Sequence, residues 1–273
     1  MMRLRFVKME GAGNDYVYVD AIRQRIDLDV AQRLAPRLAD RHYGIGGDGL
    51  ILLAPSASAD VRMVMWNADG SRGAMCGNGV RCLAKLAYDE GIARRPSIVV
   101  ETDGGVRAVD LLFDGATVVG ARVDMGAVRV ETEPRTLLVT GRTVTFHAGD
   151  AGNPHAVVFV DDVDAAPVEE VGRGLQRAAT FPDGVNVEFV EVRPDGSLRQ
   201  RTFERGSGET LACGSGATVA AAAAVRTGRV AGPKVDVLLR GGTLTIDVGD
   251  DRVLMSGPAR EVFRGEVEVD PTA

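Results

Sequence analysis

Two turns of the same form, Cys-Gly-Asn-Gly at 76–79 and Cys-Gly-Ser-Gly at 213–216, most restrict how this chain can fold. Trp66 precedes Cys76 by ten residues, and Phe203 precedes Cys213 by ten residues. Three pairs recur in the same order at offsets of 139, 135 and 137 residues: Gly13-Asn14 with Gly152-Asn153, Asp48-Gly49 with Asp183-Gly184, and Cys76 with Cys213. Three recurrences at nearly constant offset predict a duplicated domain of about 130 residues.

Each turn leads into an apolar segment that predicts a buried helix. Ala217–Val225 has no polar side chain except Thr218, and a helix that is apolar on all sides must be buried. The segment from Gly77 to Gly91 follows the first turn in the same way. Because most of the surrounding sequence predicts strands, we expect a curved sheet wrapped around one central helix, twice. Symmetry between the halves would then bring two helix N-termini to one cleft between the domains.

Short strands account for most of the remaining pattern. β-Branched or alternating runs predict strands at Val61–Trp66, Ser97–Thr102, Thr143–His147, Ala156–Val160 and Val185–Val190. The pair Gly241-Gly242 predicts a hairpin turn. Further helices are expected at 29–41, interrupted at Pro36, and at 168–178. Since no low-complexity linker occurs, the domain boundary is expected in a connection between two strands.

Composition excludes several classes of protein. The chain has 32 basic and 38 acidic residues among 273, which argues against a nucleic-acid-binding surface. Its longest apolar run has nine residues, whereas a membrane-spanning helix needs about 20. The N-terminal sequence lacks the apolar core of a secretory signal. Three cysteines and three histidines favour neither a disulfide scaffold nor a histidine-rich metal site. We therefore expect a cytoplasmic protein that binds a small molecule but no nucleic acid, membrane or metal; the sequence does not give its oligomeric state, and a homodimer is one expectation.

A cysteine at a helix start can act as an acid or a base. The helix N-terminus lowers the pKa of a thiol, and bare N–H groups beside glycine can approach a ligand carboxylate. Two thiols on opposite sides of one carbon suit inversion of a stereocentre: one thiolate removes a proton, and the other thiol returns one to the opposite face. A buried structural cysteine is the alternative for either turn alone, and Cys82, six residues into its helix, fits that alternative.

Other motifs carry less weight. The segment 44–49 matches G-x-G-x-x-G, but a strand-like run follows it where a dinucleotide-binding site needs a helix. No phosphate-binding loop and no G-x-S-x-G nucleophile turn occurs in the sequence. The spacing of Cys76 and Cys82 does not fit a zinc site, and Cys76 and Cys213 lack the spacing of a redox dithiol.

The segments NADGSRGAMCGNG (67–79) and FERGSGETLACGSGAT (203–218) resemble the two signature segments of diaminopimelate epimerases. Segments 11–20, 44–53, 152–162 and 184–190 resemble further blocks of that family, in the same order. The resemblance implies an α/β (α+β) fold of two pseudo-symmetric domains, each a β-barrel-like curved sheet around a central buried helix. It implies domains at 1–122 and 123–259, with the strand at 260–273 returning to the first. It also implies catalysis without pyridoxal phosphate or another cofactor.

The resemblance assigns roles residue by residue. It implies that Cys76 and Cys213 are the catalytic pair and that His155 and Glu204 tune the thiols. It implies that the following residues bind substrate: Asn14, Asn67, Gly77, Asn78, Asn153, Asn186, Glu204, Arg205, Gly214 and Ser215. From the residues alone, an asparagine beside glycine is usually a turn residue, and Arg205 is compatible with a surface charge. Gly49 stands where some family members carry a substrate-binding glutamine, so we assign Gly49 no such role.

The implied reaction interconverts LL- and meso-2,6-diaminopimelate by a two-base mechanism, in lysine and peptidoglycan-precursor biosynthesis. Because this substrate has two identical ends, directional groups such as a guanidinium fork must hold the non-reacting end. One alternative is a related cofactor-independent racemase of another amino acid, of the histidine or proline type. Proline-type enzymes resemble MCGHG at the first turn, where this chain has MCGNG. A non-catalytic amino-acid-binding protein is the alternative from another class.

Overall fold

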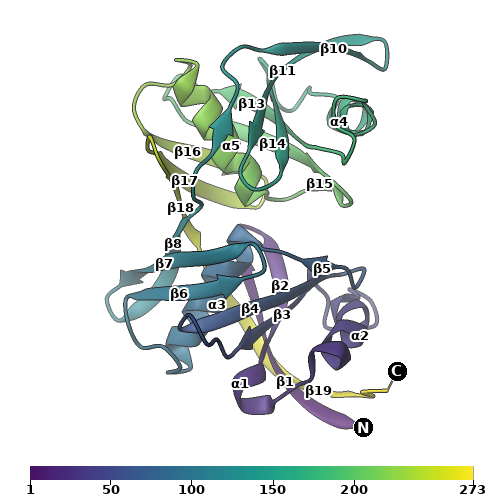
Figure 1. The fold of residues 1–273 in the computed structure, drawn as a ribbon, viewed down its shortest axis with the longest axis vertical. Helices are drawn as coiled ribbons and strands as arrows, with labels where there is room; N and C mark the ends of the chain where they lie inside the picture. Colours follow the sequence, from purple (N-terminus) through teal and green to yellow (C-terminus); the bar gives the residue numbers. More distant parts are fainter. Residues whose placement is uncertain (273) are drawn as a thin grey trace. The chain divides into compact units, whose positions relative to one another are not determined.

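Residues 1–272 are described by the structure, which is a computed structural model (Figure 1). They form two units: residues 1–123 with 257–272, and Asp124–Ser256. The division falls inside two strands, β8 (Thr117–Asp124) and β18 (Val253–Pro258), and not in a connection between strands as we expected.

The elements of the first unit, besides β8, are β1 (Met2–Gly11), β2 (Asn14–Asp20), α1 (Ala21–Gln24), α2 (Leu28–Ala39), β3 (Gly49–Ala54), β4 (Val61–Asn67), β5 (Arg72–Gly73), α3 (Gly77–Asp89), β6 (Ser97–Thr102), β7 (Gly105–Asp114) and β19 (Arg260–Val269). Those of the second, besides β18, are β9 (Arg129–Val130), β10 (Arg135–Val139), β11 (Arg142–Asp150), β12 (Pro154–Phe159), α4 (Val168–Gln176), β13 (Asn186–Val192), β14 (Leu198–Glu204), β15 (Gly208–Thr210), α5 (Gly214–Arg226), β16 (Lys234–Leu239) and β17 (Gly242–Val248).

The two units repeat one order of strand pairing. In the first, β2 lies parallel to β3, β3 antiparallel to β4, β4 antiparallel to β5 and parallel to β6, and β6 antiparallel to β7. In the second, β12, β13, β14, β15, β16 and β17 pair in the same directions. Each first parallel pair is joined through helices, as a parallel connection requires. The duplication predicted from the repeats is confirmed.

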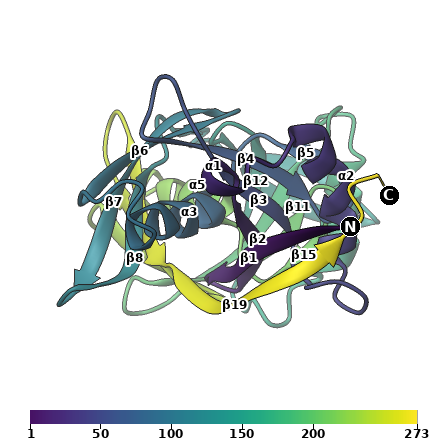
Figure 2. The ribbon, with the colours of Figure 1, turned by 90° about the horizontal axis from the view of Figure 1, so that it is seen from below.

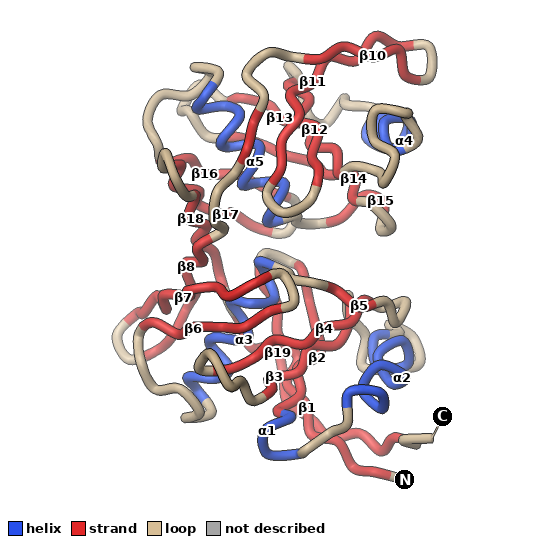
Figure 3. Tube along the Cα trace, viewed as in Figure 1, coloured by secondary structure: helices blue, strands red, loops and turns tan. Residues whose placement is uncertain are grey.

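A buried helix lies inside the sheet of each unit. Every residue of α5 from Gly216 to Ala224 is buried, and α5 packs against strands that include β12, β13 and β17 (Figure 3). The helix α3 is buried from Gly77 to Ala87, with Lys85 paired to Asp89 at 2.7 Å. The predicted α+β fold, a curved sheet around a central helix in each of two related units, is confirmed.

The outer helices α2 and α4 cover separate apolar cores. In the first unit, Leu34 and Leu38 of α2 pack with Val17, Leu50 and Trp66 of the sheet. The predicted interruption at Pro36 is wrong, because α2 continues to Ala39, and the N–H of Asp40 donates to the Pro36 carbonyl at 3.1 Å. Proline removes one N–H and crowds the preceding turn, but the buried Leu38 and Ala39 hold the last turn against the sheet.

The C-terminal strand β19 pairs antiparallel with β1, from Met2 opposite Val269 to Glu10 opposite Arg260 (Figure 2). The predicted hairpin at Gly241-Gly242 joins β16 to β17, with Leu239 opposite Gly242.

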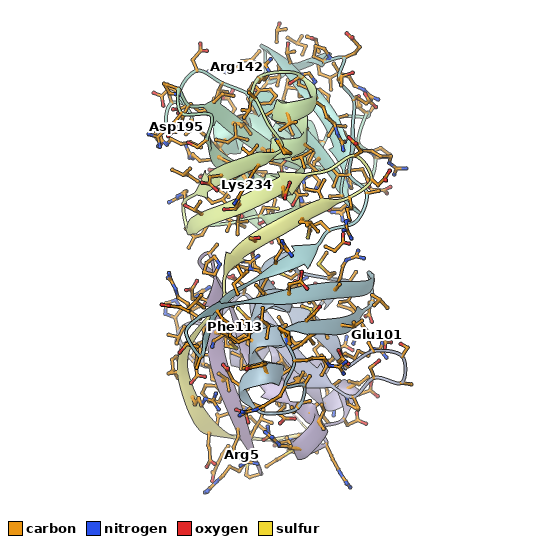
Figure 4. All side chains as sticks on the ribbon, turned by 90° about the vertical axis from the view of Figure 1, so that its left-hand side faces the viewer. Arg5, Glu101, Phe113, Arg142, Asp195 and Lys234 are labelled. Atoms are coloured by element: carbon orange, nitrogen blue, oxygen red, sulfur yellow. The ribbon has the colours of Figure 1, made fainter. Side chains whose placement is uncertain are left out.

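Charged side chains such as Arg142, Asp195 and Lys234 project from the surface of the second unit (Figure 4). Among residues 1–272, no helix combines the length and apolar character that crossing a membrane requires.

Candidate active site

Cys76 caps the central helix of the first unit. Its backbone is extended, with φ −128° and ψ 117°, and its sulfur accepts a hydrogen bond from the N–H of Gly79 at 3.3 Å. The sulfur therefore takes the place of the oxygen in an ordinary N-cap. The N–H groups of Gly77 and Asn78 have no acceptor within the helix, as at any helix N-terminus, and can bind an anion.

Cys213 caps the central helix of the second unit in the same way. Its backbone has φ −118° and ψ 109°, and its sulfur accepts from the N–H of Gly216 at 3.4 Å. The Ser215 hydroxyl lies 3.6 Å from this sulfur. The N–H groups of Gly214 and Ser215 correspond to those of Gly77 and Asn78. Each unit thus contains one cysteine-capped helix N-terminus that can hold a carboxylate.

The surroundings of Cys213 favour the protonated thiol. Burial raises the pKa of Cys213 well above its ordinary value, and the negative charges of Glu204 and Glu188 raise it further. Hydrogen bonds from Ser215 and Gly216 act in the opposite direction without cancelling this effect. Burial also raises the pKa of Glu204, whose carboxylate accepts hydrogen bonds from the Thr210 hydroxyl and the Cys213 thiol.

A buried histidine joins two further groups of the second unit. His155 Nδ1 lies 2.8 Å from Glu188 Oε1, and His155 Nε2 lies 3.1 Å from Asn153 Oδ1. His155 and Glu188 are fully buried on the parallel strands β12 and β13. Sequence reasoning missed Glu188. The only signal was a carboxylate between Val187 and Phe189 in a run that predicts a strand, where an exposed strand face explains a glutamate equally well.

Cys76 has a different set of neighbours. Its thiol donates to Asn14 Oδ1 at 3.1 Å, and Asn14 Nδ2 donates to Asp48 Oδ2. The Tyr16 side chain also reaches Cys76 and Asn14, and burial raises the pKa of this tyrosine well above its ordinary value. The structure thus brings Asn14 to the sulfur, together with two residues that sequence reasoning did not select.

Four predicted residues remain: Asn67, Asn78, Asn186 and Arg205. Asn67 is exposed at the end of β4, where its side chain donates to Ser71 Oγ at 3.0 Å. Asn78 is only 2% exposed, and within residues 1–272 its Oδ1 atom has no hydrogen-bond partner. Asn186 Oδ1 accepts from the N–H of Arg205 at 2.8 Å, which holds the backbone that carries this arginine. The Arg205 side chain is exposed and donates to the Asp183 carbonyl at 2.9 Å.

The structure explains why position 49 is a glycine and not a residue with a side chain. A Cβ atom at this position would lie 2.0 Å from the Trp66 carbonyl oxygen, so this backbone accepts no side chain there.

Cys82 is fully buried in α3, and burial raises the pKa of its thiol to about 11. Within residues 1–272, no three His, Cys, Asp or Glu side chains gather in a way that could hold a metal ion.

Comparison with known proteins identifies the family. A family model described as diaminopimelate epimerase matches residues 6–131 and 148–262. The chain belongs to the diaminopimelate epimerase family. Diaminopimelate epimerase of Desulfovibrio desulfuricans is 46% identical over 96% of this chain and 98% of that protein. The enzyme of the same name from Leptospira biflexa is 44% identical over 98% of this chain and all of that protein. This member of the family is therefore an isomerase that acts as an epimerase on a small molecule.

Solved structures with low sequence identity share the fold of this epimerase. A Bacillus anthracis protein of the PhzF family has a TM-score of 0.79 and is 16% identical, with 98% of this chain and all of that chain covered. A structure described as a probable proline racemase from Agrobacterium radiobacter has a TM-score of 0.74 and is 15% identical, with 98% and 94% covered. At such identities these likenesses extend to the fold alone.

Proposed function

We propose that this epimerase interconverts LL- and meso-2,6-diaminopimelate by a two-base mechanism that uses Cys76 and Cys213. The observation that carries the proposal is the cysteine cap at the central helix of each unit, with its sulfur bonded to the third N–H of the helix. Two related acid–base groups, one from each unit, supply what inversion at a carbon requires. The reaction would serve lysine and peptidoglycan-precursor biosynthesis in the cytoplasm.

The helix N-termini supply the electrostatic part of the mechanism. Removal of an α-proton moves negative charge onto the adjacent carboxylate. The N–H groups of Gly77, Asn78, Gly214 and Ser215 would receive this carboxylate, because they have no acceptor within their helices. The positive ends of two helix dipoles then favour the charge that develops during the reaction.

Cys213 would enter the cycle as the acid. Burial and the charges of Glu204 and Glu188 keep its proton bound when no substrate is present. Cys76 would then remove the proton from one face of the carbon, while Cys213 donates its own proton to the other face. In the reverse direction the two roles exchange. His155 supports this arrangement through Glu188, whose position it fixes.

The other polar groups would hold the substrate. Arg205 can fork onto the far carboxylate, and its backbone is held by Asn186. Glu204 and the amide oxygens of Asn67 and Asn153 would accept from the far ammonium group, and Asn14 and Asn78 lie beside the first thiol turn. These directional contacts allow one end to be recognised while the other reacts.

The test is incubation with LL-diaminopimelate in D2O without added cofactor, with stereochemistry and deuterium uptake followed together. Cys76→Ala and Cys213→Ala should each abolish epimerisation, because each removes the group that serves one face. Each variant should still exchange the α-hydrogen of one stereoisomer slowly, and the two variants should prefer opposite stereoisomers. Cys82→Ala is the matched control, since this third cysteine is fully buried in α3, and it should retain activity.

Substantial epimerisation by either Cys76→Ala or Cys213→Ala would contradict the two-base mechanism. Turnover of proline or histidine, with none of diaminopimelate, would move the chain to a related racemase. Loss of activity on removal of pyridoxal phosphate, restored on its addition, would contradict the cofactor-independent reaction.

A further inference from the structure

A chain of three side chains in the first unit ends at the Cys76 sulfur. Asp48 Oδ2 accepts from Asn14 Nδ2, and Asn14 Oδ1 accepts from the Cys76 thiol at 3.1 Å. The same Asp48 oxygen accepts from the N–H of Asp15 at 3.0 Å. All of these atoms lie in or beside β2, the segment that precedes β3, and the cap of α3. The chain therefore stands on contacts within one unit.

Asp48 determines which end of the Asn14 amide faces the sulfur. The oxygen and nitrogen ends of an amide have nearly the same shape, so their hydrogen-bond partners decide the orientation. A carboxylate only accepts, and it therefore holds the Nδ2 end. This leaves Oδ1, which also only accepts, toward Cys76. An amide that turned over would present N–H groups to the sulfur instead.

The other carboxylate oxygen of Asp48, Oδ1, also accepts a hydrogen bond. Arg41 Nη2 donates to Asp48 Oδ1 at 2.9 Å and to Asp15 Oδ1 at 2.6 Å. The Asp48 carbonyl accepts from the N–H of Ala68 at 3.0 Å, which fixes the backbone. The carboxylate thus has a donor on each oxygen and little freedom to release Asn14.

We infer that Asp48 is a positioning residue that keeps the oxygen of Asn14, and not its N–H, against Cys76. The inference rests on the proposed role of Cys76 as a base. A thiolate that receives an N–H bond from an amide is stabilised and becomes a weaker base. An amide oxygen gives no such bond, so the thiolate stays basic enough to remove a weakly acidic α-proton. Asn14 thereby acts on the thiol as well as on the substrate.

The test variant is Asp48→Asn, which keeps the shape but lets the Asn14 amide turn over. The rate at which iodoacetamide alkylates Cys76 at neutral pH, read from the peptide that contains it, should rise about fivefold, the effect of one hydrogen bond. At a pH where Cys76 is fully ionised, the kcat for diaminopimelate should fall by up to about fivefold, because the same hydrogen bond makes the thiolate a weaker base, with KM changed less than about twofold. A change of structure alone would not raise the reactivity of one thiol while leaving KM unchanged.

Asp15→Asn is the matched control. The Asp15 carboxylate pairs with Lys8 and with the same arginine, Arg41, as Asp48 does. It should lower stability without changing the alkylation of Cys76. In an Asn14→Ala background, Asp48→Asn should have no further effect on the alkylation of Cys76, because the inferred effect of Asp48 on this thiol passes through Asn14. If Asp48→Asn does not fold, Arg41→Gln, which alters an exposed side chain, should raise the alkylation rate to a smaller extent.

Unchanged alkylation in a folded Asp48→Asn protein, an equal effect of Asp15→Asn, or full additivity with Asn14→Ala would each overturn the inference. Alkylation requires no substrate, so it is measured independently of the proposed function. If Asp48→Asn raises the alkylation rate of Cys76 as expected but the protein does not turn over diaminopimelate, only the substrate assignment is wrong. Normal turnover with unchanged alkylation would remove only the role of Asp48.

Discussion

Replacement of Gly216 by alanine should damage the second unit much more than the equivalent change, Gly79→Ala, damages the first. A Cβ atom on Gly216 would lie 2.4 Å from Glu188 Oε1 and 3.0 Å from the adjacent carboxyl carbon. A Cβ atom on Gly79 would lie 2.7 Å from Ile51 Cδ1 and 3.2 Å from Met63 Cε. The first clash involves a fully buried carboxylate, whereas the second involves the ends of two apolar side chains.

The magnitudes follow from what must move. Alanine in place of glycine in a helix is worth about 1 kcal/mol in either variant. Displacing Glu188 breaks its 2.8 Å contact with His155, and breaking a buried pair costs about 3–5 kcal/mol. Gly216→Ala should therefore lose about 2–4 kcal/mol of unfolding free energy. Overpacking beside Ile51 costs about 1–3 kcal/mol, so Gly79→Ala should lose about 0–2 kcal/mol.

Denaturant unfolding, followed by both tryptophan fluorescence and circular dichroism, distinguishes the unfolding of one unit from that of the other. The chain has one tryptophan, Trp66, which is buried in the first unit, so its fluorescence reports that unit, while circular dichroism reports both. Gly216→Ala should shift the dichroism transition and leave the fluorescence transition nearly unchanged. At temperatures where it stays folded, its kcat/KM should fall about a hundredfold, because the groups around Cys213 are displaced. Equal stability of the two variants would refute the role given to Glu188.

Two further predictions concern the second unit. Glu204→Gln should lower the pKa of Cys213, because the negative charge of Glu204 raises this pKa. The pH midpoint for alkylation of Cys213 should therefore move down. An unchanged midpoint would show that Glu204 does not tune this thiol. Arg205→Lys should raise KM for diaminopimelate about tenfold with little change in kcat, because lysine keeps the charge but loses the fork; unchanged steady-state kinetics would make Arg205 a surface charge only.

The parts of the fold that the sequence predicted are those with a strong local pattern. The run Ala217–Val225 is rich in alanine and nearly free of polar side chains, which predicts a buried helix, and the two cysteine turns predicted where the central helices begin. The continuation of α2 beyond Pro36 was not predictable in this way. It depends on Leu38 and Ala39 packing against a sheet whose strands come from elsewhere in the chain.

For the site, the pattern predicted which residues cap the helices but not what surrounds them. Glu188 stands between the apolar Val187 and Phe189 in its strand, and its role appears only when the parallel pairing of β12 with β13 places it beside His155. Asp48 likewise precedes a glycine in an ordinary turn motif, and its contact with Asn14 joins segments 34 residues apart. Contacts between distant segments leave no periodic signal in the sequence.

The two units share one fold but give their thiols different surroundings, and Gly79 and Gly216 show where the difference lies. Each glycine donates its N–H to the capping sulfur, and each has no room for a Cβ atom. Beside Gly79 the obstructing atom is a methyl group of Ile51, and beside Gly216 it is the carboxylate of Glu188. A carboxylate in place of a methyl group raises the pKa of the nearby thiol and favours its protonated form. In the proposed mechanism the repeated fold supplies two corresponding thiols. Glu188, which stands where the first unit has Ile51, adds to the effects of burial and Glu204 that keep Cys213 protonated, as the acid of such a pair must be.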